Sequence, residues 1–271
     1  MCRYILSEKD SLVIANRQFS SRLMLGTGKY KNFQEAQSAI KASGCEILTV
    51  AVRRAQNSSV EGIDKLLHTL DWKKIWLMPN TAGCQTTEQA IRLAFIGREI
   101  LKNLNYVDNN FLKLEVIPDP KYLLPDGIGT LTAAEYLISK KFDILPYINA
   151  DPILSKQLEE LGCATVMPLG SPIGSNQGLK NLYNIKIIIE GAKVPVIVDA
   201  GIGSPSQAAE AMETGASGIL TNTAIAKAYF PKDMASAMKL GVISGRLAYL
   251  AGKAERLNVA QPSSPIVGLS Q

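Results

Sequence analysis

Short apolar runs alternate with longer amphipathic stretches along almost the whole chain. The runs are rich in Val, Ile, Leu and Met and do not alternate cleanly with polar residues. That pattern is typical of strands that are covered on both faces in a parallel sheet. The runs predict strands at Leu23–Leu25, Ile47–Val52, Ile75–Met78, Phe111–Ile117, Asp143–Tyr147, Thr165–Met167, Val194–Asp199 and Gly218–Thr221.

The stretches between the runs carry apolar residues at the three- and four-residue spacing of amphipathic helices. They predict helices at Phe33–Ala42, Thr87–Leu101, Thr130–Ser139, Pro152–Leu161, Pro205–Thr214 and Pro231–Ala251. The fifth helix has clear end signals, with Ser204 as its cap, Pro205 at its first position and Gly215 after its end. A strand–helix unit repeated about eight times predicts a (β/α)8 TIM barrel rather than a doubly wound sheet of five or six strands.

No Ser/Gly-rich linker interrupts this rhythm, so the sequence predicts a single domain over residues 1–271. Only the two ends depart from the pattern. We expect mobile tails over about residues 1–15 and 261–271.

The composition and charge exclude several classes of protein. Hydrophobic residues make up 46% of the chain and charged residues 20%, which is typical of a globular protein. The net charge of +5 is mild and its basic residues are scattered, which argues against nucleic-acid binding. No apolar run reaches the roughly 18 residues that span a bilayer. The acidic residues near the N-terminus argue against a secretory signal and a transit peptide, so we expect the protein to work where it is made.

The sequence has few residues that could bind a metal ion or support catalysis by histidine. The four cysteines, at positions 2, 45, 84 and 163, are far apart, which argues against a zinc site and a disulfide framework. His68 is the single histidine, and its simplest interpretation is an imidazole on a helix surface. The sequence therefore predicts no metal site.

The fourth predicted strand carries two charged residues on one face. Side chains alternate along a strand, so Lys113 and Glu115 share a face, and the apolar residues between and beside them share the other. The apolar face suits the helices, which directs the lysine and the glutamate into the barrel. Desolvation there favours a neutral amine, the nucleophile that forms Schiff bases with carbonyl substrates. A structural Lys–Glu pair is the equally weighted alternative.

The last two predicted strands end in turns that suit a phosphate. The seventh strand ends at Asp199, and Gly201 and Gly203 follow it; Thr223 follows the eighth strand. Loops at these places in TIM barrels commonly hold a phosphate with backbone N–H groups. An ordinary turn that needs glycine is the alternative interpretation. An acid beside a bound phosphate is unfavourable, so Asp199 is expected to have another role.

Three further segments carry residues that suggest a site. The glycine-rich segment 167–178 after the sixth strand indicates an active-site loop, with a plain surface loop as the alternative. The sequence Gly26-Thr-Gly-Lys29 lacks the earlier glycine of a P-loop and is discounted. Arg53 and Arg54 are placed to meet an anion or to form a surface ion pair.

Eight stretches of the chain together resemble the bacterial and plastid thiazole synthase family of thiamine biosynthesis. The similarity extends from about Phe19 to about Gly268. The stretches are LGTGKY (25–30), TVAVRR (49–54), PNTAG (79–83), KLEVI (113–117), LLPD (123–126), VMPLGSPIGS (166–175), VDAGIG (198–203) and NTAIA (222–226). Their set and order are highly specific for this family.

The resemblance implies a condensation of 1-deoxy-D-xylulose 5-phosphate with dehydroglycine and a sulfur atom, which yields a thiazole phosphate. It implies Lys113 as the lysine that forms an imine with the sugar, and Glu115 and Asp199 as general acids and bases. The family's sugar-phosphate contacts correspond to Gly174, Ala200, Gly201, Asn222 and Thr223. It implies no metal and no redox cofactor. Which acid acts at which step stays open.

The resemblance also implies partners and a location. The partners are a ubiquitin-like sulfur-carrier protein that delivers a thiocarboxylate, an enzyme that supplies dehydroglycine, and further copies of the chain in a homotetramer. Neither a nucleic acid nor a membrane is expected as a partner. The location is a bacterial cytoplasm or, for a plastid-encoded protein, the plastid stroma. Two alternatives are a Schiff-base aldolase that acts on a phosphorylated ketose and a barrel that only binds the carrier protein.

Overall fold

The computed structural model describes residues 10–53, 74–104, 108–254 and 257–264. Its main sheet has eight parallel strands in the order β8-β7-β6-β5-β4-β3-β10-β9, and bridges between Val166 and Val196 and between Leu169 and Asp199 join its two edges into a barrel. The strands are β3 (Leu23–Gly26), β4 (Ile47–Ala51), β5 (Trp76–Asn80), β6 (Phe111–Leu114), β7 (Asp143–Ile148), β8 (Met167–Pro168), β9 (Ile197–Asp199) and β10 (Gly218–Thr221). The predicted TIM barrel and its eight strands are confirmed.

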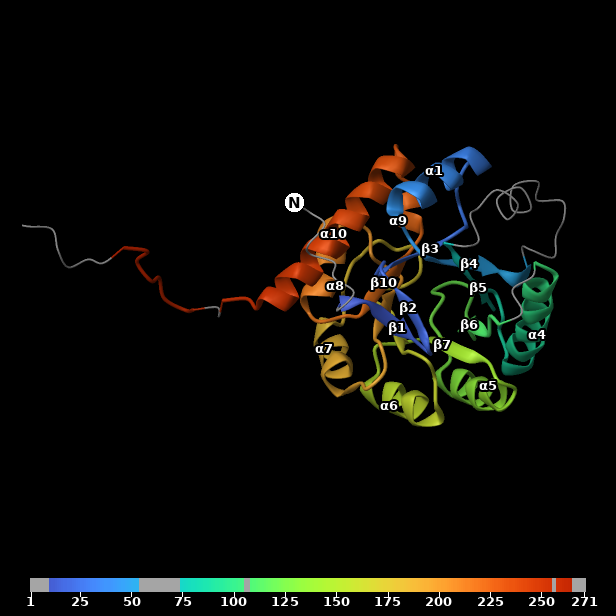
Figure 1. The fold of residues 1–271 in the computed structure, drawn as a ribbon. Helices are drawn as coiled ribbons and strands as arrows, with labels where there is room; N and C mark the ends of the chain where they lie inside the picture. Colours follow the sequence, from blue (N-terminus) through green and yellow to red (C-terminus); the bar gives the residue numbers. More distant parts are fainter. Residues whose placement is uncertain (1–9, 54–73, 105–107, 255–256, 265–271) are drawn as a thin grey trace, which may run out of the picture.

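Helices form a ring around the strands, as Figure 1 shows. They are α1 (Phe33–Ser43), α4 (Thr87–Asn103), α5 (Gly127–Ser139), α6 (Pro152–Leu161), α7 (Leu182–Gly191), α8 (Pro205–Glu213), α9 (Thr223–Ala226) and α10 (Pro231–Ala251). Six of these agree with the predicted helices within a few residues. The sequence analysis missed α7 and the four-residue α9. Helix α7 is apolar over much of its length, so its pattern lacks a clear polar face.

The helix-end signals in the sequence work as predicted. Ser204 accepts a hydrogen bond from the Gln207 amide, and Pro205 opens α8. Thr86 does the same for α4, accepting from the Gln89 amide. These caps satisfy amide groups that the helix itself leaves without a partner, and so fix where each helix begins.

A short antiparallel hairpin lies against the end of the barrel at which the strands begin. It consists of β1 (Leu12–Ile14) and β2 (Arg17–Phe19), and Leu12, Ile14 and Phe19 are buried. Figure 1 shows both strands across the barrel interior within the helix ring. Residues 12–14 fall within the tail expected over about 1–15 but form a strand with two buried residues, so the expectation does not hold for them; residues 1–9 lie outside the described part of the chain. Three-residue strands carry too little pattern to be found by periodicity.

The hairpin covers an apolar layer inside the barrel. Each barrel strand contributes one side chain to this lower layer, and together they are Met24, Ile47, Met78, Phe111, Leu145, Met167, Ile197 and Leu220. A separate, larger core lies between the strands and the helices, and it includes the outward-facing Leu112, Leu114 and Val116 of the fourth strand segment. The barrel is therefore sealed below by hydrophobic packing, which leaves its other end open for a site.

A partly buried ionic cluster connects segments of the chain near the hairpin. The Asp10 carboxylate accepts hydrogen bonds from the guanidinium groups of Arg22, at 2.9 Å, and Arg246, at 2.5 to 3.2 Å. Arg22 also donates to the Ser217 carbonyl at 2.6 Å. Because these residues belong to the N-terminal segment, the position just before β3 and α10, the cluster joins distant parts of the chain.

The described residues at the C-terminal end carry no helix or strand, and residues 257–264 are exposed. Figure 1 shows them leading away from the barrel after α10. Within the part of the chain that the structure describes, no helix has the length and apolar composition that crossing a membrane requires.

Candidate active site

A cavity of about 320 Å³ opens at the carboxyl ends of the barrel strands. This volume suits a small phosphorylated metabolite, because ligand pockets start near about 300 Å³. The described residues that line it include Lys113, Glu115 and Asp199 together with residues of every predicted phosphate loop. The mouth of the barrel therefore brings together side chains that lie up to about 200 positions apart in the sequence.

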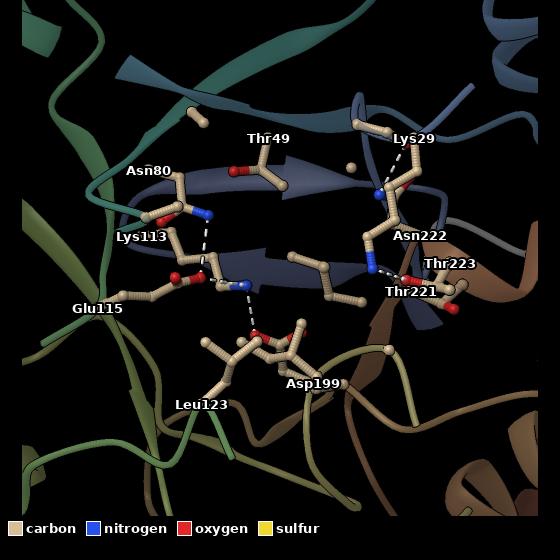
Figure 2. A pocket seen from close by; sticks show the side chains of 18 of the residues that line it. Lys29, Thr49, Asn80, Lys113, Glu115, Leu123, Asp199, Thr221, Asn222 and Thr223 are labelled. Atoms are coloured by element: carbon tan, nitrogen blue, oxygen red, sulfur yellow. Dashed lines mark hydrogen bonds and ion pairs between the residues drawn. The ribbon is translucent and has the colours of Figure 1, made fainter. Parts of the chain in front are cut away.

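Lys113 lies between two carboxylates at the centre of this cavity, as Figure 2 shows. Its Nζ is 2.5 Å from Asp199 Oδ2 and 3.1 Å from Glu115 Oε1. All three side chains are at most 5% exposed. The predicted face of the fourth strand is confirmed, since Lys113 and Glu115 point inward while the neighbouring apolar residues face the helices. Asp199 comes from the end of β9 on the far side of the barrel opening.

The electrostatics of this triad differ from the expectation of a neutral lysine. Burial alone lowers the pKa of Lys113, but the adjacent Asp199 and Glu115 outweigh it and raise that pKa above the ordinary value. Burial raises the pKa of Asp199, although the Lys113 ammonium opposes the shift. The two acids therefore favour the ammonium form of the resting lysine, against the neutral form that desolvation favours. Asp199 is correspondingly a stronger base than an exposed aspartate.

Strand-end polar groups fix the position of Glu115. The Asn80 side-chain amide donates to Glu115 Oε1 at 3.0 Å, and Thr81 bonds both the backbone N–H and the carbonyl of Glu115 at 2.7 and 2.9 Å. Within the described chain, Thr49 Oγ1 and Asn80 Oδ1 are buried without a hydrogen-bond partner. Both residues line the cavity, so these oxygens are available to a bound polar molecule.

The loop after β9 approaches the loop after β8 backbone to backbone. Ala200 and Gly201 adopt the left-handed conformation, with φ of 62° and 75°. A side chain at Gly201 would collide with Ser171, so this position requires glycine for space as well as for its φ. Gly174, with φ of 76°, lies on the same rim and also lines the cavity. The glycine-rich segment after the sixth strand is therefore confirmed as part of the cavity wall.

Asn222 and Thr223 complete the rim where β10 passes into α9. The Asn222 side chain donates to the Gly28 carbonyl at 2.9 Å. The Thr223 hydroxyl accepts a hydrogen bond from Lys29 Nζ at 3.1 Å. All five predicted phosphate-contact positions line one cavity, although their role as contacts stays a prediction.

Sequence reasoning missed several residues of the cavity wall. Thr49, Asn80 and Lys29 all line it. Lys29 belongs to the Gly26–Lys29 segment, which does not have the sequence of a P-loop. The segment nevertheless lines the cavity. Position at the end of a predicted barrel strand was the signal that could have found Thr49 and Asn80.

Of the remaining candidates, the structure describes Arg53, which does not line the cavity. Arg53 is exposed and donates to the Gln89 side chain at 3.3 Å, while Arg54 and His68 lie outside the described residues. Among residues 10–53, 74–104, 108–254 and 257–264, no group of three or more His, Cys, Asp or Glu side chains is placed to hold a metal ion.

Comparison with known proteins adds sequence evidence to this geometry. A sequence profile described as "Thiazole biosynthesis protein ThiG" matches residues 13–265. The thiazole synthase of Emiliania huxleyi is 72% identical over 262 residues, which are 97% of this chain and 95% of that protein. The thiazole synthase of Porphyra purpurea is 60% identical over 268 residues, 99% of this chain and 97% of that protein.

The chain belongs to the ThiG thiazole synthase family. Its activity is therefore thiazole synthesis in thiamine biosynthesis, as the resemblance implied. Between the alternatives left open by the sequence, this excludes a barrel without enzymatic activity and a ketose-phosphate aldolase as the main function.

Two further matches are to a fused protein and to a crystallised complex. A "Bifunctional protein ThiO/ThiG" of Trichormus variabilis is 62% identical over 259 residues, which are 96% of this chain and 40% of that protein. The crystal structure of the Amycolatopsis orientalis BexX/CysO complex superposes with a TM-score of 0.79 at 31% identity, covering 92% of this chain and 98% of that one. The thiamine phosphate pyrophosphorylase of Pyrococcus furiosus, at 16% identity and a TM-score of 0.54, shares the fold alone; the match covers 83% of this chain and 96% of that one.

Proposed function

We propose that this member of the ThiG family condenses 1-deoxy-D-xylulose 5-phosphate with dehydroglycine and a sulfur atom to form the thiazole phosphate part of thiamine. One observation carries the proposal. A buried lysine lies between two carboxylates at the mouth of a TIM barrel, within a cavity large enough for the sugar phosphate. A lysine and two acids supply what imine chemistry on a ketose needs, which is a nucleophile and groups that move protons.

The first step is imine formation by Lys113. The resting ammonium must lose a proton before its nitrogen can attack, and the Asp199 carboxylate at 2.5 Å is placed to take it. The raised pKa of Asp199 supports this assignment, because a more basic carboxylate accepts the proton more readily. The nitrogen then attacks the C2 carbonyl of the sugar, and the carbonyl oxygen leaves as water after protonation.

The imine makes the neighbouring C–H bond acidic, because it accepts electrons better than the ketone does. Glu115 and Asp199 move the protons of the enolisation and of the loss of water that follow. Asn80 donates to Glu115 Oε1 at 3.0 Å, the same oxygen that faces Lys113, and so holds the carboxylate beside the lysine. In this scheme the two acids act on opposite sides of one nitrogen and need neither a metal nor a redox cofactor.

The phosphate of the sugar occupies the rim formed by Gly174, Ala200, Gly201, Asn222 and Thr223. The left-handed turns at the first three positions support this assignment, because such turns expose backbone groups without a side chain between them and the ligand. Figure 2 places Thr223 away from Glu115 with the Lys113 amine between them. A ketose phosphate therefore fits with its carbonyl at Lys113 and its phosphate at the rim.

The sulfur arrives as the thiocarboxylate of a small ubiquitin-like carrier protein, and a second enzyme supplies dehydroglycine. The BexX/CysO complex supports the first partner, since a barrel of closely similar shape was crystallised in a complex. The fused ThiO/ThiG protein supports the second, because a fusion keeps two activities together. We propose a homotetramer in a bacterial cytoplasm or a plastid stroma, consistent with relatives from algae and cyanobacteria.

Borohydride trapping tests the proposal directly. The purified protein is incubated with 1-deoxy-D-xylulose 5-phosphate, reduced and digested, and the added mass is mapped by mass spectrometry. A reduced adduct on Lys113 is the expected result. A folded protein that gives no adduct, or an adduct on another lysine, would remove the imine mechanism. Thiazole formation on addition of the carrier thiocarboxylate and dehydroglycine then tests the sulfur step separately.

A further inference from the structure

The charged residues at the centre of the cavity are expected to repel a phosphate bound at the proposed rim. Of the described residues that line the cavity, four carry charge, and they are Lys29, Lys113, Glu115 and Asp199. Lys113 is bracketed by both carboxylates, so this triad has a net charge of −1. A phosphate that carries up to two negative charges is repelled by such a centre. The remaining cation of this lining, Lys29, is the group that can offset the repulsion.

Lys29 reaches the rim from a different barrel strand than the rim residues do. It follows β3, and its Nζ donates a hydrogen bond of 3.1 Å to the Thr223 hydroxyl beyond β10. The same Nζ would lie 2.9 Å from a Cβ placed on Gly174, so it stands directly over that glycine. Figure 2 shows the Lys29 side chain descending onto Thr223 at the end of the cavity away from Glu115. Its ammonium therefore contacts two of the positions proposed to hold the phosphate.

The Lys29 ammonium also lacks a competing carboxylate. No acidic side chain in the described part of the chain forms an ion pair with it, and its hydrogen bond there is to a neutral hydroxyl. The residue holds a left-handed backbone conformation, with φ of 70°, which is uncommon for a residue with a side chain. The backbone turn and the contact with Thr223 together keep an unneutralised cation at the cavity rim.

We propose that Lys29 is a substrate-specificity residue that binds the phosphate of the sugar directly and so selects the phosphorylated ketose over the free one. The inference rests on the proposed function, because it takes the same substrate and the same rim. It adds an ionic contact to a rim otherwise built from backbone and neutral side chains. A charge-assisted contact of this kind strengthens binding of phosphate without acting on the reacting carbon.

Two variants at matched positions test this role. Lys29→Gln removes the charge while keeping most of the side-chain length. Lys31→Gln makes the same change two residues farther along the loop, at an exposed position outside the described cavity lining. For each variant, the concentration dependence of borohydride trapping on Lys113 is measured with 1-deoxy-D-xylulose 5-phosphate and with 1-deoxy-D-xylulose, which lacks the phosphate.

Lys29→Gln is expected to raise the half-saturating concentration of the phosphorylated sugar by about 10- to 100-fold, which is the range of one charged hydrogen bond. The value for the unphosphorylated sugar should change less than about twofold, and Lys31→Gln should match the wild type for both. Lys29→Arg should recover most of the lost affinity, because it keeps the charge.

Two outcomes would overturn the role of Lys29. One is unchanged affinity of Lys29→Gln for the phosphorylated sugar. The other is equal weakening for both sugars, which would mean that Lys29 supports the loop rather than the phosphate. The failure of the proposed function looks different, since no adduct would then form on Lys113 of the wild-type protein with either sugar.

Discussion

The lower and upper halves of the barrel interior are built from the same strands but have opposite chemistry. The lower layer is apolar and comes from Met24, Ile47, Met78, Phe111, Leu145, Met167, Ile197 and Leu220. Two positions later on the same strands stand Gly26, Thr49, Asn80, Lys113, Asp199 and Asn222, which line the cavity, and Tyr147 and Leu169, which form a small cluster beside it. Side chains two apart along a strand share a face, so the apolar layer and the cavity lining follow each other on the same inward face, and Leu220 belongs to both.

The contrast between the apolar lower layer and the polar cavity explains how the barrel tolerates a buried ionic triad. A lysine and two acids in a barrel interior cost desolvation free energy even when paired. The lower layer lies directly beneath them, and the hairpin of β1 and β2 seals it from solvent. The apolar half thus stabilises the barrel, while the polar half can hold groups in positions that chemistry requires. Substitutions in the two halves should therefore separate stability from turnover.

The largest expected effect is the loss of turnover on replacing Lys113. Lys113→Arg keeps a cation between Asp199 and Glu115 but cannot form an imine, because guanidinium stays protonated. Thiazole formation should fall by about 10³-fold or more, the scale expected when a nucleophile is removed. Thermal unfolding and circular dichroism should show a folded barrel.

Lys113→Ala serves as the companion variant. It should be equally inactive but less stable than Lys113→Arg, since two buried carboxylates then face each other without a cation. Thiazole formation at the wild-type rate by either variant would contradict both the imine and the division between the two halves.

The second largest effect concerns stability and lies in the lower layer. Phe111 is two residues before Lys113, is 3% exposed and packs edge-on against Trp76 with ring centroids 5.7 Å apart. Phe111→Ala should lower the free energy of unfolding by about 3–5 kcal/mol, as measured by urea denaturation. The trapped adduct on Lys113 should still form at low temperature, because the deleted ring does not reach the cavity.

Phe111→Leu is the matched control, because it keeps most of the buried volume and should cost less than about 1.5 kcal/mol. A Phe111→Ala variant that retains full stability but loses imine formation would reverse the assignment of the two layers.

A smaller, pH-dependent effect is expected from the ionic cluster beside the hairpin. Hydrogen bonds from Arg246, together with the charge of Arg22, hold the pKa of Asp10 below its usual value. Such a depressed pKa adds stability that is present above the unfolded-state pKa, near 3.8, and is lost as the pH falls through the folded-state pKa. Asp10→Asn should lower the free energy of unfolding by about 2 kcal/mol at pH 7.

That difference from the wild type should shrink as the pH falls below about 4, in urea titrations at each pH. A difference that stays constant down to pH 2 would contradict the depressed pKa of Asp10. Turnover at pH 7 should be close to that of the wild type, because the cluster lies at the sealed end of the barrel.

The sequence predicts the repeated strand–helix units far better than it predicts the hairpin or the contacts between distant loops. The buried strands and capped helices carry strong local patterns, and so does the alternation that directs Lys113 and Glu115 inward. The hairpin at Leu12–Phe19 does not, because its burial depends on a barrel end assembled from all eight strands. Lys29 was missed for a similar reason, since its partner Thr223 lies 194 positions away and no local motif marks the pair.

The electrostatics of the triad were beyond sequence reasoning for a related cause. Lys113 and Glu115 lie on the same strand, and from these two residues a desolvated neutral amine and a structural Lys–Glu pair were equal alternatives. Asp199 enters from another strand, and together with Glu115 it raises the lysine's pKa against the effect of burial. A carboxylate from a distant strand thus contributes to the protonation of the proposed nucleophile, and no local sequence pattern reveals that contribution.

The smallest expected effect is at the rim and separates binding from chemistry within the upper half itself. Thr223→Val removes the hydroxyl that accepts from Lys29 and keeps the shape of the side chain. If the hydroxyl binds the phosphate in the ground state and the transition state alike, the KM for 1-deoxy-D-xylulose 5-phosphate should rise about 10-fold and kcat should change little. Thr223→Ser, which restores the hydroxyl, should recover the wild-type KM. A kcat defect without a change in KM would instead connect Thr223 to the chemistry at Lys113, and the upper half would then act as one unit rather than as a binding rim beside a reacting centre.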